Sequence, residues 1–190
     1  MKTHGIRSLA SLGFIVALLH LTSCVQTVAR TNSTKPPTLT KKCSVDTAAM
    51  LAAHNAWRAK VGVQPLQWSD SLVDVAQQWA DQLATTTCHP IHNRTQYGEN
   101  IYWGSAVSWS DGRTEASVTF PKDVVKSWGD EDKYYSYATN RCHGVCGHYT
   151  QLVWKDTKQV GCGMAVCGNK QQIWVCNYYP AGNAVGKRPY

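Results

Sequence analysis

The chain lacks the local signatures of several common protein classes. Neither the Gly-x-Ser-x-Gly elbow of serine hydrolases nor the His-Glu-x-x-His motif of zinc proteases occurs, so the local sequence indicates neither mechanism. The apolar stretch 9–21 is shorter than the about 20 residues that a membrane-spanning helix needs. No internal repeat or low-complexity domain is visible, which argues against a solenoid or a fibrous protein.

The folded part also lacks an excess of charge of one sign. The formal net charge of the chain is +7, but six bases lie in residues 1–42, where no acid occurs, and residues 43–190 hold 13 bases and 12 acids. A nucleic-acid-binding domain normally carries a basic stripe, so we expect no nucleic-acid partner. The basic tail could touch an anionic membrane surface, but a soluble linker explains it more simply.

The N-terminus is predicted to be an export signal. Lys2 and Arg7 precede the apolar stretch 9–21, which is the pattern of a secretory signal peptide. The following Leu21-Thr22-Ser23-Cys24 resembles a bacterial lipobox, with cleavage before Cys24 and acylation of its thiol; ordinary cleavage after Ala29 is the alternative. We therefore expect a lipoprotein-like signal peptide over 1–23, a basic Thr/Ser/Pro linker over 24–42 and a folded domain over 43–190, with membrane contact only through a lipid anchor.

Eight cysteines in 190 residues indicate an oxidising, extracytoplasmic compartment, either secreted or at the cell envelope. The length suggests one domain, and we expect a monomer.

Hydrophobic periodicity predicts helices first and strands last. Asp46 or Thr47 can cap a helix that runs to about Lys60, with Met50, Leu51, His54 and Arg58 on one face. Further helices are expected after Ser69 or Asp70 and from Pro121, separated by an irregular region over 88–113. Strands are expected at 149–154, 159–166 and 171–178, and their short connections make them antiparallel. This order favours an α+β layered domain.

Several short motifs together point to one family. They are His54-Asn55, Gly98-Glu99-Asn100-Ile101, Gly147-His148-Tyr149-Thr150-Gln151 and Cys176-Asn-Tyr-Tyr-Pro180. The chain resembles the CAP superfamily (cysteine-rich secretory, antigen 5 and pathogenesis-related-1 proteins), closest to plant PR-1-like and bacterial members. The resemblance covers roughly residues 46–190. It implies a disulfide-stabilised, three-layer α-β-α sandwich around a central antiparallel sheet, the CAP or SCP domain.

The resemblance also implies a cleft tetrad of His54, Glu99, Glu131 and His148, in which His54 and His148 hold a divalent metal such as Zn²⁺. Imidazoles suit Zn²⁺, and two histidines would leave an open site. The alternative is a pair of histidines held by hydrogen bonds to the two glutamates. His89 and His92 beside Cys88 look metal-like, but the resemblance assigns Cys88 to a disulfide and His92 to a loop, so neither is expected to be a ligand.

Six cysteines allow 15 pairings from sequence alone. The resemblance implies the pairs Cys88–Cys167 and Cys162–Cys176, which leaves Cys142 with Cys146 as a short loop. Cys43 is then free or pairs between molecules. The C-terminal Pro-x-Gly-Asn segment resembles a releasable plant peptide signal, but we expect it to pack on the domain.

Three functions fit these observations. The first is a binding protein for a small apolar ligand, such as a sterol or fatty acid, or for an extracellular protein partner, with a role in host interaction or defence. The second is a metal-dependent extracellular hydrolase or protease that uses the histidine–glutamate cluster. The third is an extracellular structural or signalling module. No motif names a catalytic nucleophile, so a binding role is favoured over an enzyme.

Overall fold

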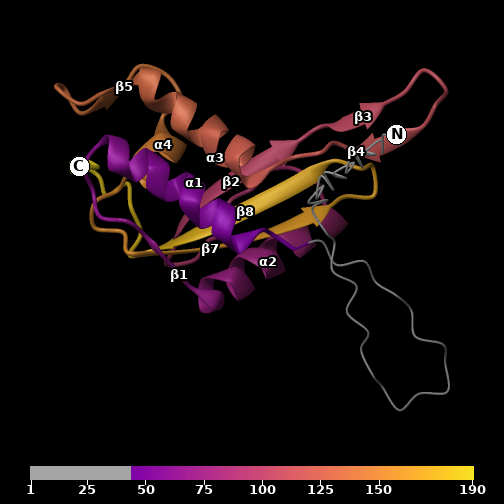
Figure 1. The fold of residues 1–190 in the computed structure, drawn as a ribbon, viewed down its shortest axis with the longest axis horizontal. Coiled ribbons are helices and arrows are strands. Elements are labelled where there is room, and N and C mark those ends of the chain that lie inside the picture. Colours follow the sequence, from indigo (N-terminus) through magenta and orange to yellow (C-terminus); the bar gives the residue numbers. More distant parts are fainter. Residues whose placement is uncertain (1–43) are drawn as a thin grey trace, which may run out of the picture.

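The computed structural model describes residues 44–190 (Figure 1). The predicted signal peptide, the lipidation site Cys24, the linker and Cys43 lie outside these residues. The helices are α1 (Thr47–Lys60), α2 (Asp70–Thr85), α3 (Pro121–Gly129), the 3₁₀ helix η1 (Asp130–Tyr134) and α4 (Gly147–Leu152). The strands are β1 (Gln67–Trp68), β2 (Gly98–Gly104), β3 (Ala106–Ser108), β4 (Thr114–Ala116), β5 (Tyr135–Ser136), β6 (Arg141–Cys142), β7 (Gln159–Val166) and β8 (Gln172–Tyr179).

The central sheet has the strand order β1-β7-β8-β2. The long strands β7, β8 and β2 pair antiparallel, as expected, whereas the short β1 runs parallel to β7. The sheet is therefore mixed rather than wholly antiparallel. The parallel pair needs a long crossover, which the chain between β1 and β7 supplies.

Two layers of helices cover the sheet, which confirms the predicted sandwich. One core contains Met50 of α1, Trp128 of α3 and Leu152 of α4, packed against one face of β7 and β8. The other contains Ala76, Ala80 and Leu83 of α2, packed on the opposite face. Figure 1 shows α1, α3 and α4 together on one side of the sheet and α2 on the other.

Glycines in β7 let α2 approach the sheet closely. A Cβ on Gly161 would lie 2.4 Å from the backbone nitrogen of Val73, and one on Gly163 would lie 2.5 Å from Cα of Gln77. Both distances are shorter than a side chain tolerates, so only glycine permits this packing. The amide of Gln77 then bonds to the backbone of Met164 and fixes the helix on the strand.

Two expected elements differ from the structure. Residues 149–154 were predicted to form a strand, but 147–152 form α4. Residues 149–154 are rich in the aromatic and β-branched residues that favour strands, and a helix of six residues is too short to show its own period. Residues 98–104, predicted to be irregular, form the edge strand β2.

The three disulfides that the sequence suggested are all present: Cys88–Cys167, Cys142–Cys146 and Cys162–Cys176. Cys88–Cys167 ties the end of α2 to the end of β7, and Cys162–Cys176 joins β7 to β8. Among residues 44–190 no helix combines the length and the apolar character needed to cross a membrane.

Candidate functional site

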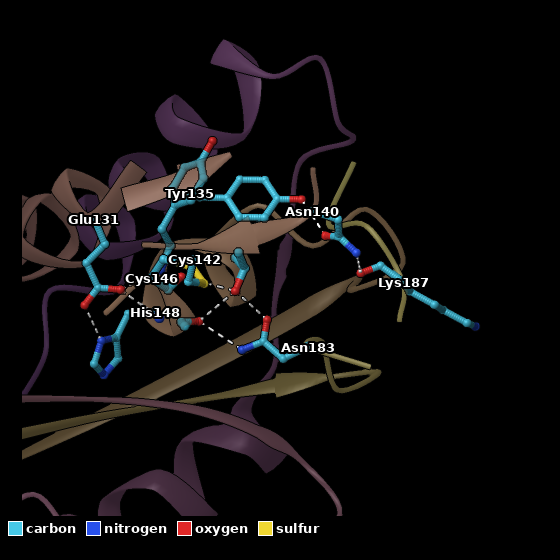
Figure 2. The surroundings of a disulfide bond; sticks show 11 residues. Glu131, Tyr135, Asn140, Cys142, Cys146, His148, Asn183 and Lys187 are labelled. Carbon is cyan, nitrogen blue, oxygen red and sulfur yellow. Dashed lines mark hydrogen bonds and ion pairs between the residues drawn. A yellow bond between two sulfur atoms is a disulfide. The ribbon is translucent and has the colours of Figure 1, made fainter. Parts of the chain in front are cut away.

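The first part of the site is a carboxylate that holds both the imidazole and the backbone of one residue. Nδ1 of His148 lies 2.6 Å from Oε1 of Glu131, while the backbone N–H groups of His148 and Tyr149 donate to Oε2 at 3.0 and 3.3 Å. Glu131, in η1, thereby satisfies free donors at the start of α4. Figure 2 shows the imidazole turned to meet this carboxylate. In the neutral tautomer that donates from Nδ1 to Glu131, the lone pair of the imidazole is on Nε2.

The second part is a matching pair that the sequence reasoning missed. Nδ1 of His92 lies 2.7 Å from Oε1 of Glu99, which also accepts from the backbone N–H of Asn93 at 3.0 Å. Glu99 is nearly buried, whereas His92 is mostly exposed. Burial raises the pKa of Glu99 above its ordinary value, and its bonds to His92 and Asn93 act in the opposite direction. A histidine seven residues before a carboxylate in an irregular segment has no diagnostic spacing, so the sequence alone does not indicate this contact.

Asn100 joins the two parts. It follows Glu99 in β2, and its side chain donates to the carbonyl oxygen of His148 at 3.0 Å. The indole N–H of Trp128 donates to the carbonyl oxygen of Ile101 at 3.3 Å, and its ring stacks on the imidazole of His148. Strand β2 thus carries Glu99 and also supports the backbone of His148 through Asn100.

His54 does not join this cluster, so its assignment to the cleft and to the metal is wrong. Its side chain is fully buried, with Nδ1 bonded to the carbonyl oxygen of Met50 at 2.8 Å and Nε2 bonded to the hydroxyl of Tyr178 at 2.9 Å. Burial lowers the pKa of His54 to about 4, so its imidazole is neutral. A neutral ring that donates through Nδ1 accepts from Tyr178 through Nε2, and neither nitrogen is left for a ligand.

The sulfur atoms nearest to His54 do not change this conclusion. His54, Cys162 and Cys176 bring their ligand atoms within 4.8 Å of one another. The two cysteines form a disulfide, and only a thiolate is a metal ligand. The buried His54 is therefore part of the core.

The imidazoles of His92 and His148 are each held in the manner of a metal-binding histidine. Each imidazole has Nδ1 held by a carboxylate and its Nε2 without a hydrogen bond in residues 44–190, which is the usual preparation of a metal-binding histidine. Oε2 of Glu99 and Oδ1 of Asn177 are buried acceptors with no donor in this part of the chain. Glu99 and Asn177 face each other across β2 and β8. Unsatisfied buried oxygens require a water, a proton or a cation.

A separate groove lies away from these residues. It has a volume of about 400 Å³ and lies between the start of α1 and the length of α2. It contains Asp70, Asp74 and Asp81 but no histidine, so it offers no imidazole ligand.

The sequence matches the cysteine-rich secretory protein family, CAP, over residues 51–178. It is 45% identical over 142 residues to pathogenesis-related protein 1C of Nicotiana tabacum, which covers 74% of this chain and 78% of the relative. It is 41% identical over 140 residues to pathogenesis-related protein 1 of Arabidopsis thaliana, covering 74% and 80%.

Solved structures share the fold. Venom allergen-like protein 4 of Schistosoma mansoni matches with a TM-score of 0.56 and 28% identity over 75% of this chain and 92% of the other. The structure described as NaASP2 with Zn²⁺ matches with a TM-score of 0.57 and 24% identity over 75% and 83%. Sequence motifs, sandwich fold and disulfides agree with these matches, and the chain is a member of the CAP family, similar to the plant pathogenesis-related-1 proteins.

Proposed function

We propose that the chain is an exported, defence-related or host-interaction binding protein that holds a divalent metal ion such as Zn²⁺ through His92 and His148. The observation that carries this proposal is the pair of imidazole–carboxylate contacts, 2.7 Å at His92 and 2.6 Å at His148. The plant relatives are pathogenesis-related proteins, which supports the defence role. The similar NaASP2 was solved with Zn²⁺.

Each residue has a defined task in this site. His92 and His148 would ligate through Nε2, while Glu99 and Glu131 hold the opposite nitrogens and fix both rings. A bound ion would supply a Lewis acid with open positions for water or a ligand. Because ligation needs neutral imidazoles, acidification should release the ion.

A binding role is favoured over hydrolysis by the environment of His148. Thr150 carries the hydroxyl nearest to it in sequence, but this hydroxyl is bonded to Oδ1 of Asn183 at 2.7 Å. It also lies within hydrogen-bond distance of the carbonyl oxygen of Cys146. Thr150 is thus engaged in holding the C-terminal segment. A sterol, a fatty acid or an extracellular protein partner remains a prediction from the family resemblance, as does the lipid anchor at Cys24.

Isothermal titration calorimetry with Zn²⁺ tests the proposal. We expect wild type to bind one ion, and we expect His92→Ala and His148→Ala each to weaken binding at least about tenfold. His89→Ala, an exposed histidine three residues before His92, is the matched control and should bind as wild type does. Equal affinity in wild type and in the His92→Ala/His148→Ala double variant would remove the proposal.

A further inference from the structure

One hairpin of the molecule stands apart from the three layers. Strands β3 and β4 form a two-stranded sheet of their own and pair with no other strand in residues 44–190. The turn between them closes with the N–H of Trp109 donating to the carbonyl oxygen of Arg113 at 2.9 Å. In Figure 1 this hairpin follows β2 and projects beyond the end of the central sheet, away from α1 and α4.

Large apolar side chains are exposed to solvent on this hairpin and in the chain on either side of it. Five of them lie between residues 103 and 120, with exposed fractions from 38% at Trp103 to 77% at Val118 and 51% at Trp109; the others are Val107 and Phe120. A hairpin of two strands has no core in which to bury such residues. Exposed large apolar side chains that lie close together in the sequence at a protrusion are typical of a contact surface.

The hairpin carries one base and two acids, which pair with one another and leave a formal charge of −1 over residues 106–116. Arg113 contacts Asp111 at 2.7 Å and Glu115 at 3.4 Å, and its guanidinium lies over the ring of Trp109 at 5.7 Å. Val107 lies opposite Glu115 in the register, and Trp109 comes directly after β3, where its N–H still donates to the carbonyl oxygen of Arg113 and continues the extended pairing. Since side chains alternate along a strand, Val107 and Trp109 lie on one face. The apolar residues therefore sit on a surface with little net charge.

The size of the hairpin decides which partner suits it. A stable protein–protein interface buries about 800 Å² on each partner, and two strands of three residues are too small to supply that area alone. Binding to a lipid bilayer has no such threshold, because its strength scales with the apolar area that is buried, and a small area gives weak, reversible binding. Tryptophan is also enriched at the headgroup level of membranes, where its ring is partly apolar and its N–H is solvated.

We propose that the β3–β4 hairpin is a membrane-contact element that places Trp109 and Val107, together with Val118 and Phe120 of the chain that follows β4, in the headgroup layer of a phospholipid bilayer. Because the ion pairs of Arg113 leave little net charge, the contact depends on apolar insertion rather than on anionic lipid. It therefore responds only weakly to salt. The contact is independent of the metal site and adds to any lipid anchor at Cys24.

Vesicle co-sedimentation tests this assignment. The protein is the mature chain carrying Cys24→Ser, so that no acyl anchor forms, and the vesicles are phosphatidylcholine. We expect the protein with the unchanged hairpin to partition onto the vesicles at both low and high salt. The Trp109→Ser/Phe120→Ser variant should lose about tenfold or more in partition coefficient.

Ile91→Ser/Val185→Ser is the matched control, since it removes two exposed apolar side chains far from the hairpin in sequence, and it should bind as wild type does. Circular dichroism checks the fold; if the first variant misfolds, Val107→Ser/Val118→Ser replaces it. Absence of vesicle binding by wild type, or equal binding by the hairpin variants, would overturn the proposal. So would concentration-dependent dimerisation in light scattering that the hairpin variants abolish, since the surface would then join two copies of the chain.

Discussion

The buried imidazole of His54 should make the stability of this protein depend on pH in a defined way. In the folded state burial lowers its pKa to about 4, against an ordinary value of 6.5. The unfolded chain therefore binds a proton more readily than the folded chain between these two values. His54 contributes stability above pH 6.5 that is lost as the pH falls towards about 4.

The loss of stability can be calculated from the pKa shift of His54. One pKa unit corresponds to about 1.4 kcal/mol, so the full change amounts to about 3 kcal/mol of the free energy of unfolding. The side chain of His54 is fully buried, so solvent does not screen its charge. Glu99, whose pKa burial raises, acts with the opposite sign and stabilises the folded state more at low pH.

Urea denaturation of wild type and His54→Gln at pH 7.5 and pH 4.5 isolates the effect. Glutamine does not titrate, and Glu99 is common to both proteins, so the difference between their pH dependences belongs to His54. We expect wild type to lose about 2–3 kcal/mol more than the variant between the two pH values. Parallel pH dependences would show that His54 is not a buried, neutral imidazole and would reopen its assignment to the cleft.

Three further predictions concern packing and positioning. Glu131→Ala removes three hydrogen bonds to His148 and Tyr149 at the start of α4, so it should lower the free energy of unfolding by about 2–4 kcal/mol in thermal denaturation. It should also abolish Zn²⁺ binding at His148, and unchanged stability would show that these hydrogen bonds are not formed. Arg58→Met leaves buried carbonyl oxygens without their donor and should cost about 3–5 kcal/mol in urea denaturation, whereas a near-neutral result would contradict the hydrogen bonds of Arg58. Gly163→Ala sets a methyl group against Gln77 of α2 and should destabilise the fold by more than 1 kcal/mol, while a gain in melting temperature would mean that α2 packs less closely.

The sequence predicted the long elements and the disulfides because their signals are local or motif-based. Helix α1 begins where Asp46 caps it, and Met50, His54 and Arg58 share its buried face as the spacing indicated. Strand β7 has the predicted bounds, and β8 starts one residue later and ends one residue later than expected. Helix α4 was mistaken for a strand because a single turn or two of helix carries too little periodicity.

The site was only partly predictable for a different reason. The spacing that places His54 on the buried face of α1 is at odds with a role in an open cleft, which only the resemblance of the His-Asn motif implies. His92 could not be paired with Glu99 from spacing alone, because the loop after Cys88 folds back to the start of β2. Contacts between irregular loops and strand ends depend on tertiary structure, which periodicity does not describe.

The most direct test of the proposed metal site is to locate the ion itself. Crystals soaked in Zn²⁺ and measured at the zinc absorption edge give an anomalous difference peak at each bound ion. We expect a peak within ligand distance, about 2.0–2.1 Å, of Nε2 of His92 or His148, with Glu99 and Glu131 still bonded to the opposite nitrogens. A peak beside His54 or His89, with none at His92 or His148, would contradict the account.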